Sequence, residues 1–116
     1  MLKRSMNGFI DPNSLAVLQP KPGWRGRFFH SERMTFAYYD IDAGATLPEH
    51  SHANEEVWHI IAGQIDVTLD GETRRIGAGH AVVIAGGKSH ALAVNEACRA
   101  IVVDSPVRRE VGGVKI

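Results

Sequence analysis

The sequence predicts an all-β fold, a sandwich or barrel of about eight short strands. Twelve glycines and five prolines divide the 116 residues into short segments. Between them lie short runs rich in Val, Ile, Phe, Tyr and Thr, the residue types that favour strands. No stretch has a capped helical period of twelve residues or more. Together these observations are typical of many short strands joined by tight turns.

The strands are expected in the order 24–30, 33–41, 55–61, 64–69, 72–76, 81–85, 90–94 and 99–104. Ile65 and Val67 alternate with Asp66 and Thr68, as in an antiparallel strand with one buried face. Asp70-Gly71 predicts a type I′ hairpin turn, because both positions tolerate positive φ. Residues 1–23 are expected to form an irregular N-terminal arm, and residues 24–116 a single domain.

Composition excludes several classes of protein. Thirteen basic and thirteen acidic residues give zero net charge, which argues against nucleic-acid binding and against a polybasic membrane surface. The single cysteine, Cys98, excludes an internal disulfide and a multi-cysteine zinc module. No apolar run approaches the ~20 residues of a membrane helix. Residues 1–8 lack the features of a secretory signal, so a cytoplasmic location is expected.

Four potential metal ligands stand out among the polar residues. His50 and His52 are two positions apart, so on an extended chain both imidazoles share a face. Glu56 begins the next expected strand, and His90 comes from a distant one. Three imidazoles and one carboxylate suit zinc, nickel, iron or manganese. The spacing alone leaves open whether the first two histidines bind a metal or merely occupy a surface turn.

The glycines around these histidines carry a resemblance. The order Gly44, His50, His52, Glu56, Gly63 resembles the first signature of the cupin superfamily, and the order Gly79, Gly87, His90 resembles the second. Ala85 stands where the family usually has proline, His80 where it has an acidic residue, and Val94 where it often has asparagine. The resemblance implies a double-stranded β-helix, that is, a jelly-roll barrel over residues 24–116. It also implies His50, His52, Glu56 and His90 as metal ligands, and a homodimer.

A closer resemblance concerns the small single-domain cupins of pectin and alginate breakdown, which open or rearrange unsaturated uronate sugars. It rests on the stretches 30–35, 44–50 and 105–108. It implies that Arg108 pairs with a substrate carboxylate. The family's acid–base aspartate is replaced by Val102, but Asp104 would share the same strand face and could move the proton. The substrate would be a small anionic or carbonyl compound, with the metal as Lewis acid.

Two other functions fit the same residues. A site of three histidines and one carboxylate that binds iron can activate dioxygen, as some cupin dioxygenases do. A barrel without catalysis could bind a sugar or another small ligand. Of the remaining histidines, His30 and His80 are expected to be exposed, and His59 is expected on the outer face or in a dimer interface. Cys98, Trp24 and Trp58 are expected to pack in the interior.

Overall fold

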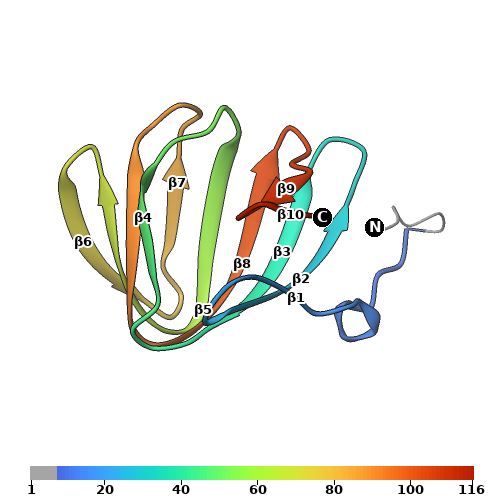
Figure 1. The fold of residues 1–116 in the computed structure, drawn as a ribbon, viewed down its shortest axis with the longest axis horizontal. Coiled ribbons are helices and arrows are strands. Elements are labelled where there is room, and N and C mark those ends of the chain that lie inside the picture. Colours follow the sequence, from blue (N-terminus) through green and yellow to red (C-terminus); the bar gives the residue numbers. More distant parts are fainter. Residues whose placement is uncertain (1–7) are drawn as a thin grey trace.

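Strands account for most of the chain in the computed structural model, which describes residues 8–116 (Figure 1). The strands are β1 Leu18–Lys21, β2 Trp24–His30, β3 Thr35–Ile41, β4 Thr46–His50, β5 Glu55–Leu69, β6 Glu72–Gly77, β7 Ala81–Ile84, β8 His90–Ser105, β9 Glu110–Val111 and β10 Val114–Lys115. A 3-10 turn, Pro12–Ser14, precedes them. Among the described residues, no helix is long and apolar enough to span a membrane. The all-β prediction is confirmed.

The alternation of residue types along the strands determines which side chains form the core. Burial alternates strictly along β2, and Trp24 and Phe28 point inward. Ile65 and Val67 on β5 are buried as their alternation predicts. The core also contains aromatic residues in contact: Trp24 and Tyr39 lie edge to face, with ring centroids 5.5 Å apart. These two rings belong to the paired strands β2 and β3, so their contact stabilises one face of the barrel.

Two long strands, β5 and β8, connect the two halves of the barrel. Residues 55–62 of β5 pair with residues 99–105 of β8, and residues 64–69 pair with residues 90–96. Strands β3 and β7 flank the first half, while β4 and β6 flank the second. The sequence predicted two separate strands in each case, with a turn at Ala62-Gly63. Gly63 instead lies in a bulged region of β5 with φ 85°, so the strand bends without ending.

Both chain ends differ from expectation. Leu18–Lys21 lie in the predicted arm, but they form β1, which pairs with the edge of β2. Pro20 made this strand difficult to predict from the sequence, because proline in a strand is confined to sheet edges, first positions and bulges. After β8, the β9–β10 hairpin buries Val111 and Ile116 against the core. Three further residues predicted in the arm, Pro12–Ser14, form the 3-10 turn, and residues 1–7 lie outside the described part.

Candidate metal centre

The structure brings together the four side chains that the sequence marked as metal ligands. His50 ends β4, His52 lies in the following turn, Glu56 is on β5 and His90 begins β8. One ring nitrogen from each of the three histidines lies within 4.8 Å of the others. The Oε2 atom of Glu56 lies 3.4 Å from Nε2 of His52, and its Oε1 atom lies 3.9 Å from Nε2 of His90. Residues from both halves of the barrel thus converge on one point.

Backbone carbonyls orient all three imidazole rings. The Nδ1 atom of His50 lies 2.9 Å from the carbonyl oxygen of Pro48, that of His52 lies 3.1 Å from Asn54, and that of His90 lies 2.9 Å from Lys88. Because a carbonyl oxygen only accepts hydrogen bonds, each Nδ1 carries the proton. In the neutral ring, the lone pair is then on Nε2, the atom that faces the centre of the cluster.

These nitrogens fit a metal ion. The Nε2 atoms of His52 and His90 are buried and have no hydrogen-bond partner within residues 8–116. Burial is the main influence on the pKa of His50 and lowers it, which favours the neutral ring. Neutral imidazoles with unsatisfied Nε2 lone pairs are the form in which histidine binds a metal. A divalent ion would satisfy atoms that the protein leaves without a partner.

Glu56 is held by two donors from outside the histidine cluster. The Nε1–H group of Trp58 donates to Oε1 over 2.7 Å, and the Nη1 group of Arg108 donates to Oε2 over 3.1 Å. Glu56 is buried, and burial acts to raise the pKa of its carboxyl group. Hydrogen bonding and neighbouring charge act more strongly and lower that pKa to about 2. The side chain is therefore a carboxylate at neutral pH, as a metal ligand must be.

Asp104 and Arg108 lie beside the ligand cluster. Asp104 is the register neighbour of Glu56 and points inward on the same face as Val102, as the strand period predicts. Its Oδ1 atom lies 3.8 Å from Nη1 of Arg108 and has no hydrogen-bond partner in the described chain. Burial, followed by the charge of Glu56, raises the pKa of Asp104 to about 8. Asp104 therefore holds a proton at neutral pH.

The expectation that His30 is exposed is wrong. His30 is buried, and its Nδ1 atom lies 2.7 Å from the hydroxyl oxygen of Thr35. That hydroxyl also donates to the backbone oxygen of Arg108 and accepts from its backbone N–H group, over 3.1 and 2.9 Å. Thr35 thus fixes the backbone of Arg108. The alternation along residues 24–30 predicts that residue 30 faces inward. The polar turn next to it had instead suggested an exposed position.

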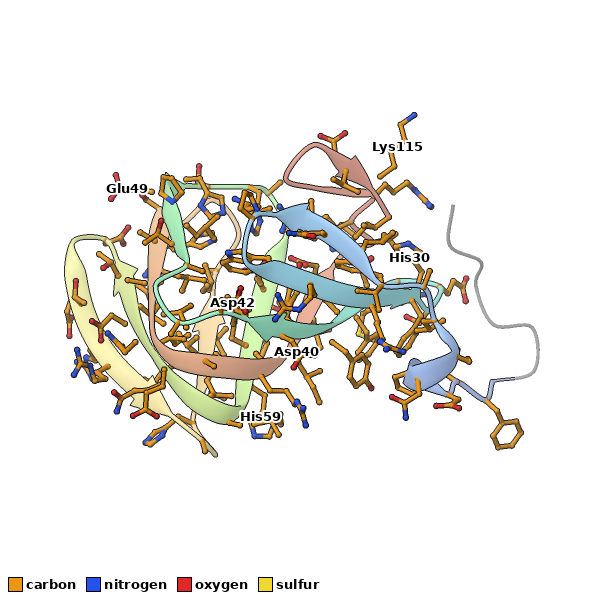
Figure 2. All side chains as sticks on the ribbon, turned by 60° about the horizontal axis from the view of Figure 1, so that its bottom comes forward. His30, Asp40, Asp42, Glu49, His59 and Lys115 are labelled. Atoms are coloured by element: carbon orange, nitrogen blue, oxygen red, sulfur yellow. The ribbon has the colours of Figure 1, made fainter. Side chains whose placement is uncertain are left out.

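The other singled-out residues agree with the sequence analysis, with one addition. His59 and His80 are exposed, and Figure 2 shows His59 at the opposite end of the barrel from Glu49, the neighbour of His50. Cys98, Trp24 and Trp58 are buried. The sequence did not reveal that Trp58 supports Glu56. Two residues apart on one strand, they share a face, which is the signal that could have linked them.

A cavity of about 260 Å³ adjoins the cluster. Its lining includes the polar residues His50, Glu56 and Arg108 and the aromatic residues Trp24, Tyr39 and Trp58. A small molecule in this space would contact the carboxylate, the guanidinium and an imidazole at once. The arrangement suits metal binding next to a pocket for a small polar ligand.

Comparison with known proteins identifies the family. The model of the Cupin domain matches residues 37–104. An uncharacterized protein of Streptomyces coelicolor is 31% identical over 81 residues, which cover 69% of this chain and 77% of that protein. The structure of KdgF from Halomonas sp. is similar, with TM-score 0.81 and 24% identity over 87% of this chain and 96% of that one. An RmlC-like cupin from Shewanella frigidimarina has TM-score 0.83 and 18% identity, over 91% and 96% of the two chains. The chain therefore belongs to the cupin domain family.

Proposed function

We propose that this cupin is a metal-dependent enzyme that rearranges a small sugar acid of the unsaturated uronate type. One observation carries the proposal: a cluster of metal-ligand type and the pair Asp104–Arg108 lie side by side at one end of the barrel. A metal-binding protein without catalysis needs no buried acid beside its ligands. A rearrangement needs a proton donor or acceptor and a group that binds the substrate's carboxylate.

The metal would be one divalent transition ion held by His50, His52, Glu56 and His90. Zinc, nickel, iron and manganese all accept three imidazoles and a carboxylate. When bound, the ion supplies Lewis-acid chemistry to a carbonyl or hydroxyl oxygen of the substrate. Trp58 supports this set from outside by fixing one oxygen of Glu56.

Arg108 would bind the substrate carboxylate. Its Nη1 group donates to Glu56 and its Nε group donates to the backbone oxygen of Glu110. Its Nη2 group makes no hydrogen bond within the described chain and can donate to a ligand in the adjoining cavity. The bonds from Thr35 fix the backbone of Arg108, while those of its own Nε and Nη1 groups fix the guanidinium.

Asp104 would move the proton. The Oδ1 atom of its buried carboxyl group makes no hydrogen bond among the described residues, so it can bond to a reacting group. Its place beside Glu56 and Arg108 puts it next to both the metal ligands and the carboxylate-binding group. Asp104 would thus take the role that the closer resemblance assigns to the position of Val102.

The test is consumption of an unsaturated galacturonate, followed as loss of its ultraviolet absorbance. We expect turnover by metal-containing protein, and a fall in kcat of at least about a hundredfold in Asp104→Asn. Asp40→Asn, a matched change at an exposed position, should leave kcat unaltered. No turnover by the wild type would contradict the proposal. Oxygen uptake by iron-loaded protein with diketones or thiols would then indicate a dioxygenase, and ligand binding without either reaction a binding protein.

We also propose that the protein is a homodimer joined through the outer face of β2, β3, β8, β5 and β7. Phe29, Phe36, Val103, Val57 and Val83 lie opposite one another in register and form an apolar row across these five strands. We call this set the outer apolar row. The rings of Phe29 and Phe36 stack with centroids 4.8 Å apart.

A cytoplasmic location and the absence of nucleic-acid and membrane partners stay predictions from the sequence.

A further inference from the structure

A lysine from the N-terminal edge strand lines the cavity beside the metal-ligand cluster. Lys21 ends β1 and lies on the cavity wall together with Arg108. The two cations differ in their surroundings. Arg108 lies 3.1 Å from Oε2 of Glu56 and 3.8 Å from Oδ1 of Asp104, whereas Lys21 has no ion pair within residues 8–116. The protein therefore balances the charge of Arg108 and leaves that of Lys21 unbalanced.

The surroundings of Lys21 disfavour its positive charge. Burial is the main cause that lowers its pKa, and the positive charge of Arg108 adds to the effect. The two cations are thus close enough to repel each other. An anion between them would relieve the repulsion and compensate the desolvation of the ammonium group.

A buried hydrogen-bond donor lies on the same cavity wall. Trp24 is 3% exposed, and its Nε1–H group has no acceptor in the described part of the chain. Buried N–H groups are nearly always bonded to protein, water or ligand. Since Trp24 lines the cavity, an acceptor oxygen placed there can meet this requirement.

The cavity is small. Its volume of about 260 Å³ lies below the ~300–1,000 Å³ usual for pockets that hold drug-sized ligands. The turn of the β9–β10 hairpin closes it on one side, because Gly112 packs so tightly on β1 that an added Cβ would lie 2.6 Å from the oxygen of Pro20. A single sugar ring fits such a space better than a chain of two or more.

We infer that Lys21 is a second substrate-binding cation, and that with Arg108 and the Nε1–H group of Trp24 it makes the cavity select a monomeric organic acid. This inference rests on the proposed function, which it deepens by naming a specificity residue. It assigns a binding role to β1, a segment outside the residues that carry the family resemblance. Neutral sugars would leave the charge of Lys21 unbalanced, and oligomers would exceed the closed volume.

The experiment uses galacturonate as the probe and tryptophan fluorescence as the readout. The chain has two tryptophans, Trp24 and Trp58, and both line the cavity, so a bound ligand changes their emission. We expect saturable binding of galacturonate to the metal-containing protein. Galactose, the neutral counterpart, and digalacturonate, the longer one, should each bind at least about tenfold more weakly. Equal affinity for either compound would overturn the stated selectivity.

The role of Lys21 is tested by Lys21→Gln, which should raise the Kd for galacturonate about tenfold or more. Lys21→Arg should restore affinity to within about threefold, because it keeps the charge. The matched control is Lys115→Gln, since Lys115 is exposed and projects away from the barrel on the neighbouring hairpin (Figure 2). If Lys21→Gln and Lys115→Gln bind galacturonate equally well, the inference is wrong.

Failure of the inference and failure of the proposed function give different results. Galacturonate binding that depends on Lys21, without turnover of any unsaturated uronate, would support the inference and contradict the proposed reaction. Turnover of an unsaturated uronate with the same KM in wild type and Lys21→Gln would support the proposed reaction and contradict the inference about Lys21. Elemental analysis of each variant keeps metal content equal across the comparison.

Discussion

Three backbone carbonyls determine which ring nitrogen carries the proton in each histidine of the cluster. Each accepts the Nδ1 proton of one ring, so His50, His52 and His90 all offer Nε2. Each carbonyl belongs to a residue two positions from its histidine: Pro48 within β4, and Asn54 and Lys88 in the segments between strands. The cluster is therefore pre-organised by local backbone geometry, and the side chains need no mutual hydrogen bond. Such orientation of ligands raises metal affinity because less conformational freedom is lost on binding.

Removal of two of these rings should abolish metal binding and preserve the fold. We expect His50→Ala/His52→Ala to lose stoichiometric metal by elemental analysis, in protein never exposed to a nickel column. The far-ultraviolet circular dichroism should match the wild type, because both side chains lie at the rim and neither belongs to the apolar core. His59→Ala/His80→Ala removes two exposed histidines and should keep its metal. Wild-type protein that holds no stoichiometric metal would refute the metal centre.

Residues that share a strand face could be predicted because their geometry is local. His50 and His52 share a face by the period of an extended chain, and Asp104 shares one with Val102 for the same reason. Lys21 and Thr35 could not be assigned in the same way. Lys21 meets the cavity through pairing of an edge strand, and Thr35 meets Arg108 across 73 residues of chain. Contacts of this kind depend on the packed fold and leave no spacing in the sequence.

The two long strands, β5 and β8, also could not be predicted from the sequence, which indicated two short strands in place of each. A glycine with positive φ ends a strand in a hairpin turn but lets a strand continue in a bulge, and the sequence around it is similar in both cases. Asp70-Gly71 is a hairpin turn, with φ 47° and 84°. Gly63 has nearly the same φ, 85°, yet lies within β5 where the strand crosses between the two halves of the barrel.

These two glycines should therefore respond differently to alanine. At Gly71 nothing lies within 4 Å of an added Cβ, so Gly71→Ala should lower the free energy of unfolding by ~1–2 kcal/mol, the strain of a left-handed residue. At Gly63 an added Cβ would collide with the backbone of Ala97 and lie 2.8 Å from the Cα of Cys98. Gly63→Ala should lose a further ~1–3 kcal/mol. Urea unfolding measures both, and equal losses would contradict a close approach of β5 and β8 at this point.

At the scale of the whole molecule, the barrel has one polar end and one apolar face. The metal-ligand cluster and its cavity occupy the end where β4, β5 and β8 meet the C-terminal hairpin. The outer apolar row crosses the sheet of β2, β3, β8, β5 and β7 on the side that faces away from the core. A second copy bound to that face would leave both cavities accessible.

The face has the size and charge that a dimer requires. Four strands of about seven residues and the four residues of β7, at ~3.3 Å per residue and ~4.8 Å between strands, give roughly 500 Å² in projection. Two such faces reach the ~1,000 Å² that a biological interface needs. Beyond the apolar row, the ion pairs Arg25–Asp42 and Arg99–Asp40 provide a polar rim whose charges balance, so two copies meet without net repulsion.

Val83→Asp should separate the dimer. Val83 ends the outer apolar row and is 59% exposed, so the change leaves the core intact but places an unpaired charge in the proposed interface. Sedimentation velocity at micromolar concentration should give twice 12.7 kDa for the wild type and 12.7 kDa for the variant. Val17→Asp alters an equally exposed valine, 52% accessible and outside the row, and should remain dimeric. A monomeric wild type would exclude the dimer, whereas a dimeric Val83→Asp would place the interface on another face.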